Sequence, residues 1–147
     1  KTILGTAQWK WMDNEIKDEY DVLLIMSSIQ VLAKDHGWEK WYNFPHERKK
    51  LLDLININKK ITIILSGDRH IGGFYKYNDY IYEITSSSFN QKTFNSFEKD
   101  EYIIGEVVTP NNFGFMEISE RNKTINIELA NGFYKDRRVF KSFKINF

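Results

Sequence analysis

Hydrophobic and polar residues follow two different periods along the chain, and the change of period divides it into two parts. In the first part, apolar residues recur at helical spacing in two segments, and each segment is followed by a near-continuous apolar run. Beyond His70, apolar and polar residues alternate over short segments separated by turn residues. The first pattern is typical of helices and buried parallel strands, and the second is typical of antiparallel hairpins.

The first part predicts two helices and two buried strands. In chain order they are a helix from the N-cap Thr6 through Trp9, Met12 and Ile16, a buried strand within residues 20–32, a helix with Asn43 as cap and Pro45 in its first turn that runs to about Asn58, and a buried strand over residues 60–66. Strand, helix and strand in this order resemble a crossover unit, which places both strands parallel and near each other in one sheet. We therefore expect Ser27 to Gln30 and Gly67 to His70 to meet at the same edge of that sheet, where open α/β sheets hold ligands.

The second part predicts two hairpins and a weaker final strand. The expected segments are residues 73–77 and 80–85 around the turn Asn78-Asp79, an irregular polar stretch from Asn90 to about Asp100, residues 113–118 and 124–129 around a turn at 120–123, and an edge strand after Gly132 with Val139, Phe140, Phe143, Ile145 and Phe147. No internal repeat and no interdomain linker interrupts the pattern. The fold class is therefore α/β, with C-terminal β-hairpins.

The composition is that of one globular domain and excludes few functions. The 147 residues are 41% hydrophobic and 16% aromatic, which is enough for a single core. Lys and Arg number 21 against 20 Asp and Glu, so the net charge of +1 gives no sign of a nucleic-acid or membrane partner. Without cysteine there are no thiolate metal ligands, and the compartment stays unknown. The chain starts with neither methionine nor a signal sequence, so we expect it to begin within a longer protein.

Two features of this pattern suggest chemistry, and each has a structural alternative. Asp68 and His70 follow the second strand directly, where a strand end aims side chains well, but an isolated Asp-x-His more often caps a turn. The loop of residues 35–45 is dense in aromatic and ionisable side chains, and such loops often line sites. Its Trp38 and Trp41 are equally consistent with packing, and Arg48 with bracing the loop.

A set of segments in a fixed order favours the site interpretation of Asp68 and His70. They are Leu4-Gly5-x-x-Gln8-Trp9-x-Trp11, Ser27 to Leu32, Trp38 to Arg48, Leu51 to Ile55 and Leu65-Ser66-Gly67-Asp68-Arg69-His70, followed by residues 82–87 and 112–114. Together they resemble the C-terminal half of PhoD-like alkaline phosphatases, which belong to the calcineurin-like metallophosphoesterase superfamily. The resemblance covers roughly Leu4 to Leu129, and it identifies residues 1–147 as the C-terminal portion of such a domain.

The resemblance implies a four-layer α/β/β/α sandwich and a centre of two metal ions. The last metal motif of the family, Gly-Asp-x-His, falls on Gly67 to His70, so Asp68 and His70 are the implied metal ligands. A carboxylate and a neutral imidazole suit iron, zinc or manganese, and the resemblance does not distinguish these metals from calcium. The implied reaction is metal-assisted hydrolysis of a small phosphate ester, either a monoester or a diester.

Three further residues correspond to weaker positions of the site. Gln30 stands where the superfamily usually has a histidine, while Asn43 and Arg48, with His46 between them, would position a phosphate or a metal-bound water. The chain has Gly73 where many relatives carry a glutamate. The earlier metal motifs of the superfamily would precede Lys1, so we expect this chain to need the N-terminal half of the same domain for activity. The alternative is a non-catalytic binding domain that contacts another chain through the loop around Trp38 and Trp41.

Overall fold

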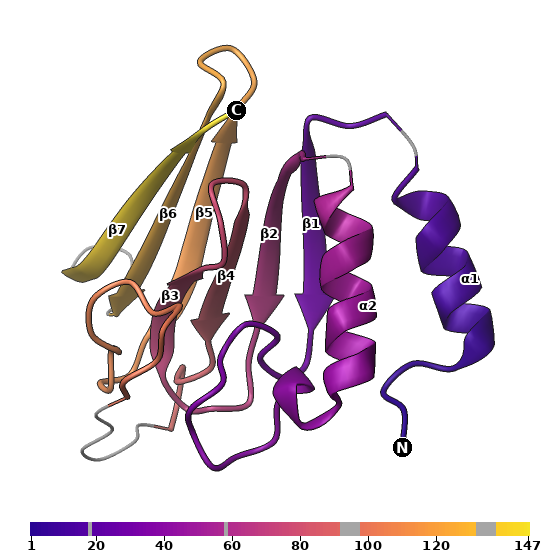
Figure 1. Ribbon diagram of the computed structural model, residues 1–147. Coiled ribbons are helices and arrows are strands. Elements are labelled where there is room, and N and C mark those ends of the chain that lie inside the picture. Colours follow the sequence, from indigo (N-terminus) through magenta and orange to yellow (C-terminus); the bar gives the residue numbers. More distant parts are fainter. Residues whose placement is uncertain (18, 58, 92–97, 132–137) are drawn as a thin grey trace.

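The computed structural model describes residues 1–17, 19–57, 59–91, 98–131 and 138–147. In chain order the elements are α1 (Thr6–Glu15), β1 (Val22–Ser27), the short 3-10 helix η1 (Trp41–Asn43), α2 (Pro45–Asn56), β2 (Ile61–Ser66), β3 (Gly72–Lys76), β4 (Ile81–Ser86), β5 (Phe113–Ser119), β6 (Thr124–Asn131) and β7 (Arg138–Asn146). They form a layer of helices and two sheets (Figure 1). The α/β class predicted from the sequence is confirmed. None of the helices in the described ranges is long and apolar enough to cross a membrane.

The first sheet has the strand order β1-β2-β4-β3. β1 pairs with β2 in parallel, from Val22 opposite Ile61 to Ser27 opposite Ser66, and β4 pairs in parallel with the other side of β2. The predicted crossover is therefore confirmed, with α2 as its helix. β3 and β4 form the predicted hairpin, whose turn is fixed by the Asn78 side-chain oxygen because it accepts the amides of Tyr80 and Ile81.

The second sheet is antiparallel, with the order β5-β6-β7. β5 and β6 form the second predicted hairpin, and β7 is the predicted edge strand. The register shifts once between β6 and β7, between Leu129 and Ala130. Parts of two predictions, residues 92–97 of the polar stretch and residues 132–137 before the last strand, lie outside the described residues.

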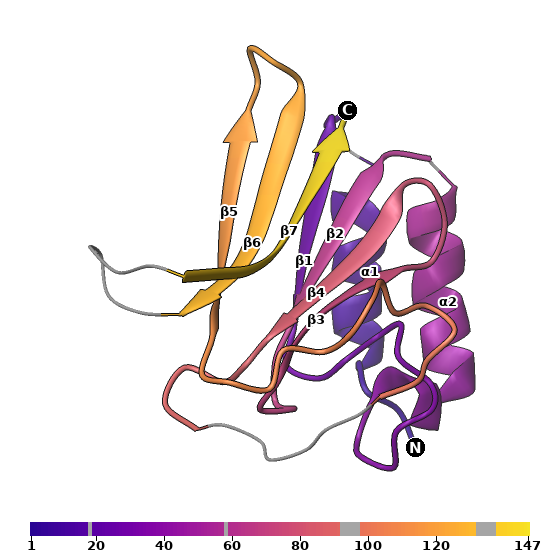
Figure 2. The same ribbon diagram turned by 90° about the vertical axis from the view of Figure 1, so that its left-hand side faces the viewer.

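Two hydrophobic cores lie on opposite faces of the first sheet. On one face α1, α2 and the segment after β1 pack against the sheet, with Trp9, Leu32, Leu51 and Ile64 among the buried side chains. On the other face the second sheet packs over β2, β3 and β4. Figure 2 shows the resulting order of layers, with the helices behind the first sheet and β5 to β7 in front of it.

β1 differs from its prediction as a fully buried strand within residues 20–32. It ends at Ser27 and lies at the edge of its sheet. Its register places Leu24 beside Ile63 and Met26 beside Leu65, on the face that the second sheet covers elsewhere. Leu24 is nevertheless 42% exposed and Met26 86% exposed, so the second sheet does not cover β1 at these two residues. The apolar run thus marks a strand whose outer face is bare in this chain.

Both predicted helix caps are wrong by one position. Gly5 rather than Thr6 is the N-cap of α1, and Phe44 rather than Asn43 is the N-cap of α2, in each case without a side-chain hydrogen bond. Pro45 occupies the first turn of α2 as predicted, because its missing N–H needs no partner there. The Glu47 carboxylate in the first turn of α2 is buried and accepts the amides of Ile3 and Leu4, so it joins α2 to the segment before α1.

Candidate functional site

The carboxyl ends of β1, β2 and β4 converge at one edge of the first sheet. A methyl group built on Gly67, just after β2, would lie 3.6 Å from the carbonyl oxygen of Ser28 and 3.7 Å from Cβ of Ser87. Ser28 follows β1 and Ser87 follows β4, so three strand ends meet around Gly67. The predicted meeting of residues 27–30 with residues 67–70 is therefore confirmed.

Asp68 and His70 lie on a tight turn directly after β2. Both have positive φ angles, 70° for Asp68 and 52° for His70, and both side chains are exposed. Left-handed backbone at two residues other than glycine is uncommon, although Asp and His tolerate it better than most. Such conformations cluster at functional sites, where surrounding contacts hold them. Arg69 N–H donates to the Gly67 carbonyl at 2.9 Å and closes the turn.

The turn is anchored from behind by Arg69 and by Ser88. The Arg69 side chain points inward, is only 6% exposed and forms an ion pair with Glu98, which also accepts a long bond of 3.4 Å from the Tyr75 hydroxyl. Ser88 is fully buried, and its hydroxyl donates to the carbonyl of His70 at 2.8 Å. These contacts fix the middle of the turn inside the protein, so the flanking carboxylate and imidazole face outward.

Gln30 is fully buried behind the same edge. Its amide nitrogen donates to the Thr85 hydroxyl at 2.8 Å, and Thr85 in turn lies 2.9 Å from the Ser66 hydroxyl. Its amide oxygen has no hydrogen-bond partner within the described ranges. Gln30 thus joins the ends of β2 and β4 rather than projecting from the surface as Asp68 does. Its assignment as a site residue stays a prediction.

Arg48 and Glu83 together hold the segment that follows Gln30. Arg48 donates to the carbonyls of Val31 and Leu32 at 2.7 and 2.9 Å, and Glu83 accepts the amides of the same two residues at 2.9 and 2.5 Å. Val31 and Leu32 are completely buried and belong to no helix or strand, so their backbone groups need such partners. Arg48 thus makes the bracing contacts that the sequence offered as one alternative, and its role in positioning a phosphate stays a prediction.

Glu83 is a buried carboxylate that sequence reasoning missed. Burial raises its pKa, and this is opposed by the Ser66 hydroxyl, the amides of Leu32 and Val31, and the charge of Arg48. An acidic residue in the middle of an otherwise alternating strand is the only signal of it in the sequence. The backbone amides that it accepts, from Val31 and Leu32, lie 52 and 51 residues away, so no local pattern could have paired them with it.

His36 is a second residue that the sequence did not single out. Burial lowers its pKa to about 4, helped by the positive charges of Arg69 and Lys40, so the imidazole is neutral at pH 7. The Trp38 amide donates to its Nδ1 at 3.2 Å, which places the proton on Nε2. Nε2 of His36 and Nη1 of Arg69 are buried donors without an acceptor in the part of the chain that the structure describes.

The remaining candidates lie away from this cluster or in the core. Asn43 is exposed at the end of η1, and the His46 side chain is 62% exposed with Nε2 3.9 Å from Glu47. Trp41 is buried, donates to the Ser27 hydroxyl at 3.0 Å and packs edge-on against Trp9. The aromatic loop therefore exposes Trp38, at 68%, but not Trp41.

The donor set fits a metal ion only in part. Asp68 and His70 offer the carboxylate and imidazole that such ions use, on a turn that holds both side chains outward. Across residues 1–17, 19–57, 59–91, 98–131 and 138–147, no group of three or more His, Cys, Asp or Glu side chains is placed to hold an ion. Two ligands alone make a weak site, so a tight centre requires ligands from outside these residues.

Comparison with known proteins shows the fold and leaves the family open. No protein-family model and no curated protein matches the sequence. Among solved structures, the chain is similar to GAP50, described as the anchor in the inner membrane complex of Plasmodium, with a TM-score of 0.71 and 18% identity over 94% of this chain. It is also similar to a structure of PhoD, with a TM-score of 0.66 and 14% identity over 98% of this chain. The chain spans only 41% and 33% of the length of these two proteins. The fold of this chain is therefore PhoD-like.

Proposed function

We propose that this chain is the C-terminal part of a PhoD-like metallophosphoesterase domain and that the complete domain hydrolyses phosphate esters. The observation that carries the proposal is the turn from Gly67 to His70, which presents a carboxylate and an imidazole at the carboxyl edge of a PhoD-like sheet. Ligands generally bind at this edge in open α/β sheets. Asp68 and His70 are the residues that would hold metal, and two divalent or trivalent ions fit the proposed chemistry.

The residues of this chain mainly hold geometry. Metal ions bound at such a centre would supply an activated water and would neutralise charge on the phosphoryl oxygens. Arg69 and Ser88 keep the backbone of the turn in place, and the clamp of Arg48 and Glu83 fixes the segment that carries Gln30. Because the other metal ligands would come from the N-terminal half of the domain, the 147 residues alone are expected to bind metal weakly and to hydrolyse little or no ester.

Metal binding by the chain itself is the first test. Mn²⁺ added to the isotope-labelled chain should broaden the imidazole NMR signals of His70 before those of His46, which is exposed but lies on α2. Asp68→Ala should abolish this selectivity and leave the rest of the spectrum unchanged. Equal broadening of both histidines would contradict the metal-ligand assignment.

Activity is the second test and needs the complete protein. There, 4-nitrophenyl phosphate and bis(4-nitrophenyl) phosphate distinguish monoesterase from diesterase activity. Asp68→Ala should abolish metal-dependent turnover of either ester without changing the unfolding transition. A folded Asp68→Ala variant with full turnover would exclude the ligand role, and a complete protein that binds metal but cleaves neither ester would exclude the enzyme.

A non-catalytic binding domain is the second candidate. Two observations favour it: Trp38 is 68% exposed, and one structure with the same fold is described as an anchor. Large exposed aromatic side chains are enriched at protein interfaces. Trp38→Ala should then weaken capture of a partner protein without affecting ester hydrolysis, whereas Asp68→Ala should do the reverse.

A further inference from the structure

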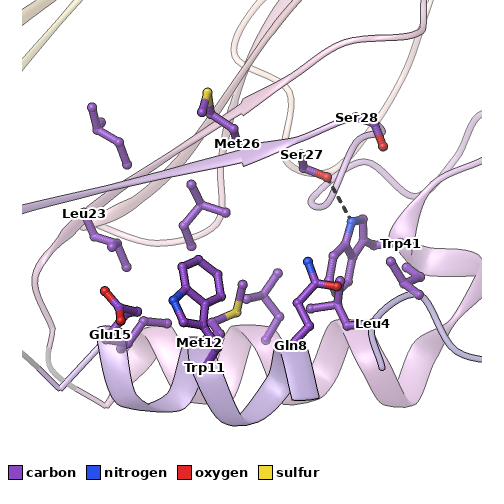
Figure 3. Close-up of a pocket in the computed structure, with 15 residues that line it drawn as sticks. Leu4, Gln8, Trp11, Met12, Glu15, Leu23, Met26, Ser27, Ser28 and Trp41 are labelled. Atoms are coloured by element: carbon purple, nitrogen blue, oxygen red, sulfur yellow. Dashed lines mark hydrogen bonds between the residues drawn. The ribbon is translucent and has the colours of Figure 1, made fainter. Parts of the chain in front are cut away.

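An apolar groove separates α1 from β1 and opens at the edge of the first sheet. It has a volume of about 460 Å³ and is lined by both elements. Figure 3 shows Gln8, Trp11 and Met12 of α1 on one side, pointing toward β1, and Leu23 of β1 pointing back toward α1 on the other. Met26 also lines the rim of the groove, but its side chain points away from α1. The groove thus exposes side chains that would be expected in a core.

Nothing in the described part of the first sheet pairs with the outer edge of β1. The N–H and C=O groups along that edge are free to accept another strand. Both faces of β1 are apolar there, with Leu23 and Ile25 toward the helices and Leu24 and Met26 toward the opposite side. A strand that is apolar on both faces is typical of the interior of a parallel sheet rather than of its edge.

The position of α1 indicates what would pair with this edge. α2 is the crossover helix of the unit β1-α2-β2, whereas α1 lies outside β1, on the side away from β2 (Figure 1). α1 therefore covers a place where the sheet would continue, on the same face as α2. A strand there, followed by α1 and β1, would form a crossover of the same hand as β1-α2-β2.

The start of α1 agrees with this arrangement. Ile3 and Leu4 line the groove together with Ser27 and Ser28, so the segment before α1 lies at the carboxyl end of β1 (Figure 3). A parallel strand in the groove would end at the same place. The solved structures of the same fold extend beyond this chain over 59% and 67% of their length, which is the complement of the 41% and 33% that it spans.

We propose that the groove between α1 and β1 holds a β-strand that runs parallel to β1 and leads, in the same polypeptide, into Lys1. This inference rests on the proposal that the chain is part of a larger PhoD-like domain. It identifies how that domain continues: by main-chain pairing along β1 and by apolar side chains under α1. The strand itself should be apolar on both faces.

The test supplies a strand and measures protection of β1. The probe is the chain fused at Lys1, through a short Gly/Ser linker, to a copy of its own residues 21–28. The β1 amides that face away from β2 should exchange with deuterium at least about tenfold more slowly in the fusion than in the parent chain. A matched fusion with proline at alternate positions of the added strand cannot pair, and should give no protection.

Two further results make the test decisive. Trp11→Ala in the fusion should reduce the protection, because it removes part of the cover that α1 gives to the added strand. Equal exchange of β1 in the fusion and in its proline control, with β2 protection intact in both, would overturn the proposal. A dimeric parent chain whose β1 edge is already protected would also overturn it, because the occupant would then be a second copy. None of these outcomes depends on metal binding or ester hydrolysis.

Discussion

The buried segment of Val31 and Leu32 gives a sharp test of how the edge of the sheet is held. Replacing Arg48 with leucine keeps the bulk of the side chain but removes two charge-assisted hydrogen bonds to buried carbonyls. It also leaves the buried Glu83 carboxylate without the nearby positive charge. Hydrogen bonds to charged groups are worth about 1.5–3 kcal/mol each, so the loss of both should cost about 3–6 kcal/mol. Since domains of this size are stable by about 5–15 kcal/mol, Arg48→Leu should remove a large part of the total stability.

The measurement is urea unfolding followed by tryptophan fluorescence. Arg48→Lys should cost about 1–2 kcal/mol, because an ammonium group can bond one of the two carbonyls but not both in the planar geometry of a guanidinium group. Lys49→Leu is the matched control, since Lys49 is the next residue of α2 and its pair with Asp53 is exposed. Exposed pairs contribute little, so this control should unfold like the parent chain. An Arg48→Leu chain within about 1 kcal/mol of the Lys49→Leu control would refute the bracing role.

Three further substitutions test other contacts of the same architecture. Burial would raise the pKa of Glu47, but hydrogen bonds from Leu4, Trp9 and Ile3 outweigh burial and lower the pKa. The Glu47→Gln chain should therefore be less stable than the parent chain above pH 4.5. Urea unfolding at a series of pH values should show this difference vanish as the pH falls through the lowered pKa. Glu83 should show the opposite pH dependence, because burial raises its pKa. The stability of the parent chain relative to Glu83→Gln should be greatest below pH 4.5 and should decline as the pH rises through the raised pKa. A stability difference that does not change with pH would contradict the raised pKa of Glu83. Arg69→Ala should release the turn, so the strong amide-to-Hα NOE of a left-handed His70 should weaken while unfolding stays cooperative; an unchanged NOE would show that the turn holds without Arg69.

Local patterns predicted those elements whose contacts are local in the sequence. The period of two and the Asn78 turn were sufficient for the first hairpin, and the apolar run ending at Gly67 was sufficient for β2. The run from Tyr20 to Leu32 was misleading, because a buried strand and a buried irregular segment have the same composition. The distinction depends on Glu83, which satisfies the backbone of Val31 and Leu32 from about 50 residues away.

In the candidate site, too, the sequence predicted the features with local contacts and missed those that depend on distant residues. The strand end and the spacing of Asp68 and His70 were readable because both lie within one turn. The role of Arg69 could not be predicted from the sequence, because nothing local indicates that a side chain between two exposed neighbours turns inward to Glu98. Trp41 and Trp38 likewise look equivalent in the sequence, and only the packing of Trp41 on Trp9 separates a core residue from an exposed one.

The geometry of parallel sheets places the end of the proposed strand and the proposed metal site at the same edge. The carboxyl ends of parallel strands lie at one edge, and in this chain that edge holds Ser28, Gly67 and Ser87. A strand parallel to β1 in the groove would end at this edge too, beside Ile3 and Leu4. The residues between that strand and Lys1 would then lie at the same edge of the sheet as Gln30 and Asp68. Each of these three segments would follow the end of a different parallel strand. If the domain is an enzyme, site residues that this chain lacks should therefore be sought in that connecting segment, ahead of any more distant part of the polypeptide.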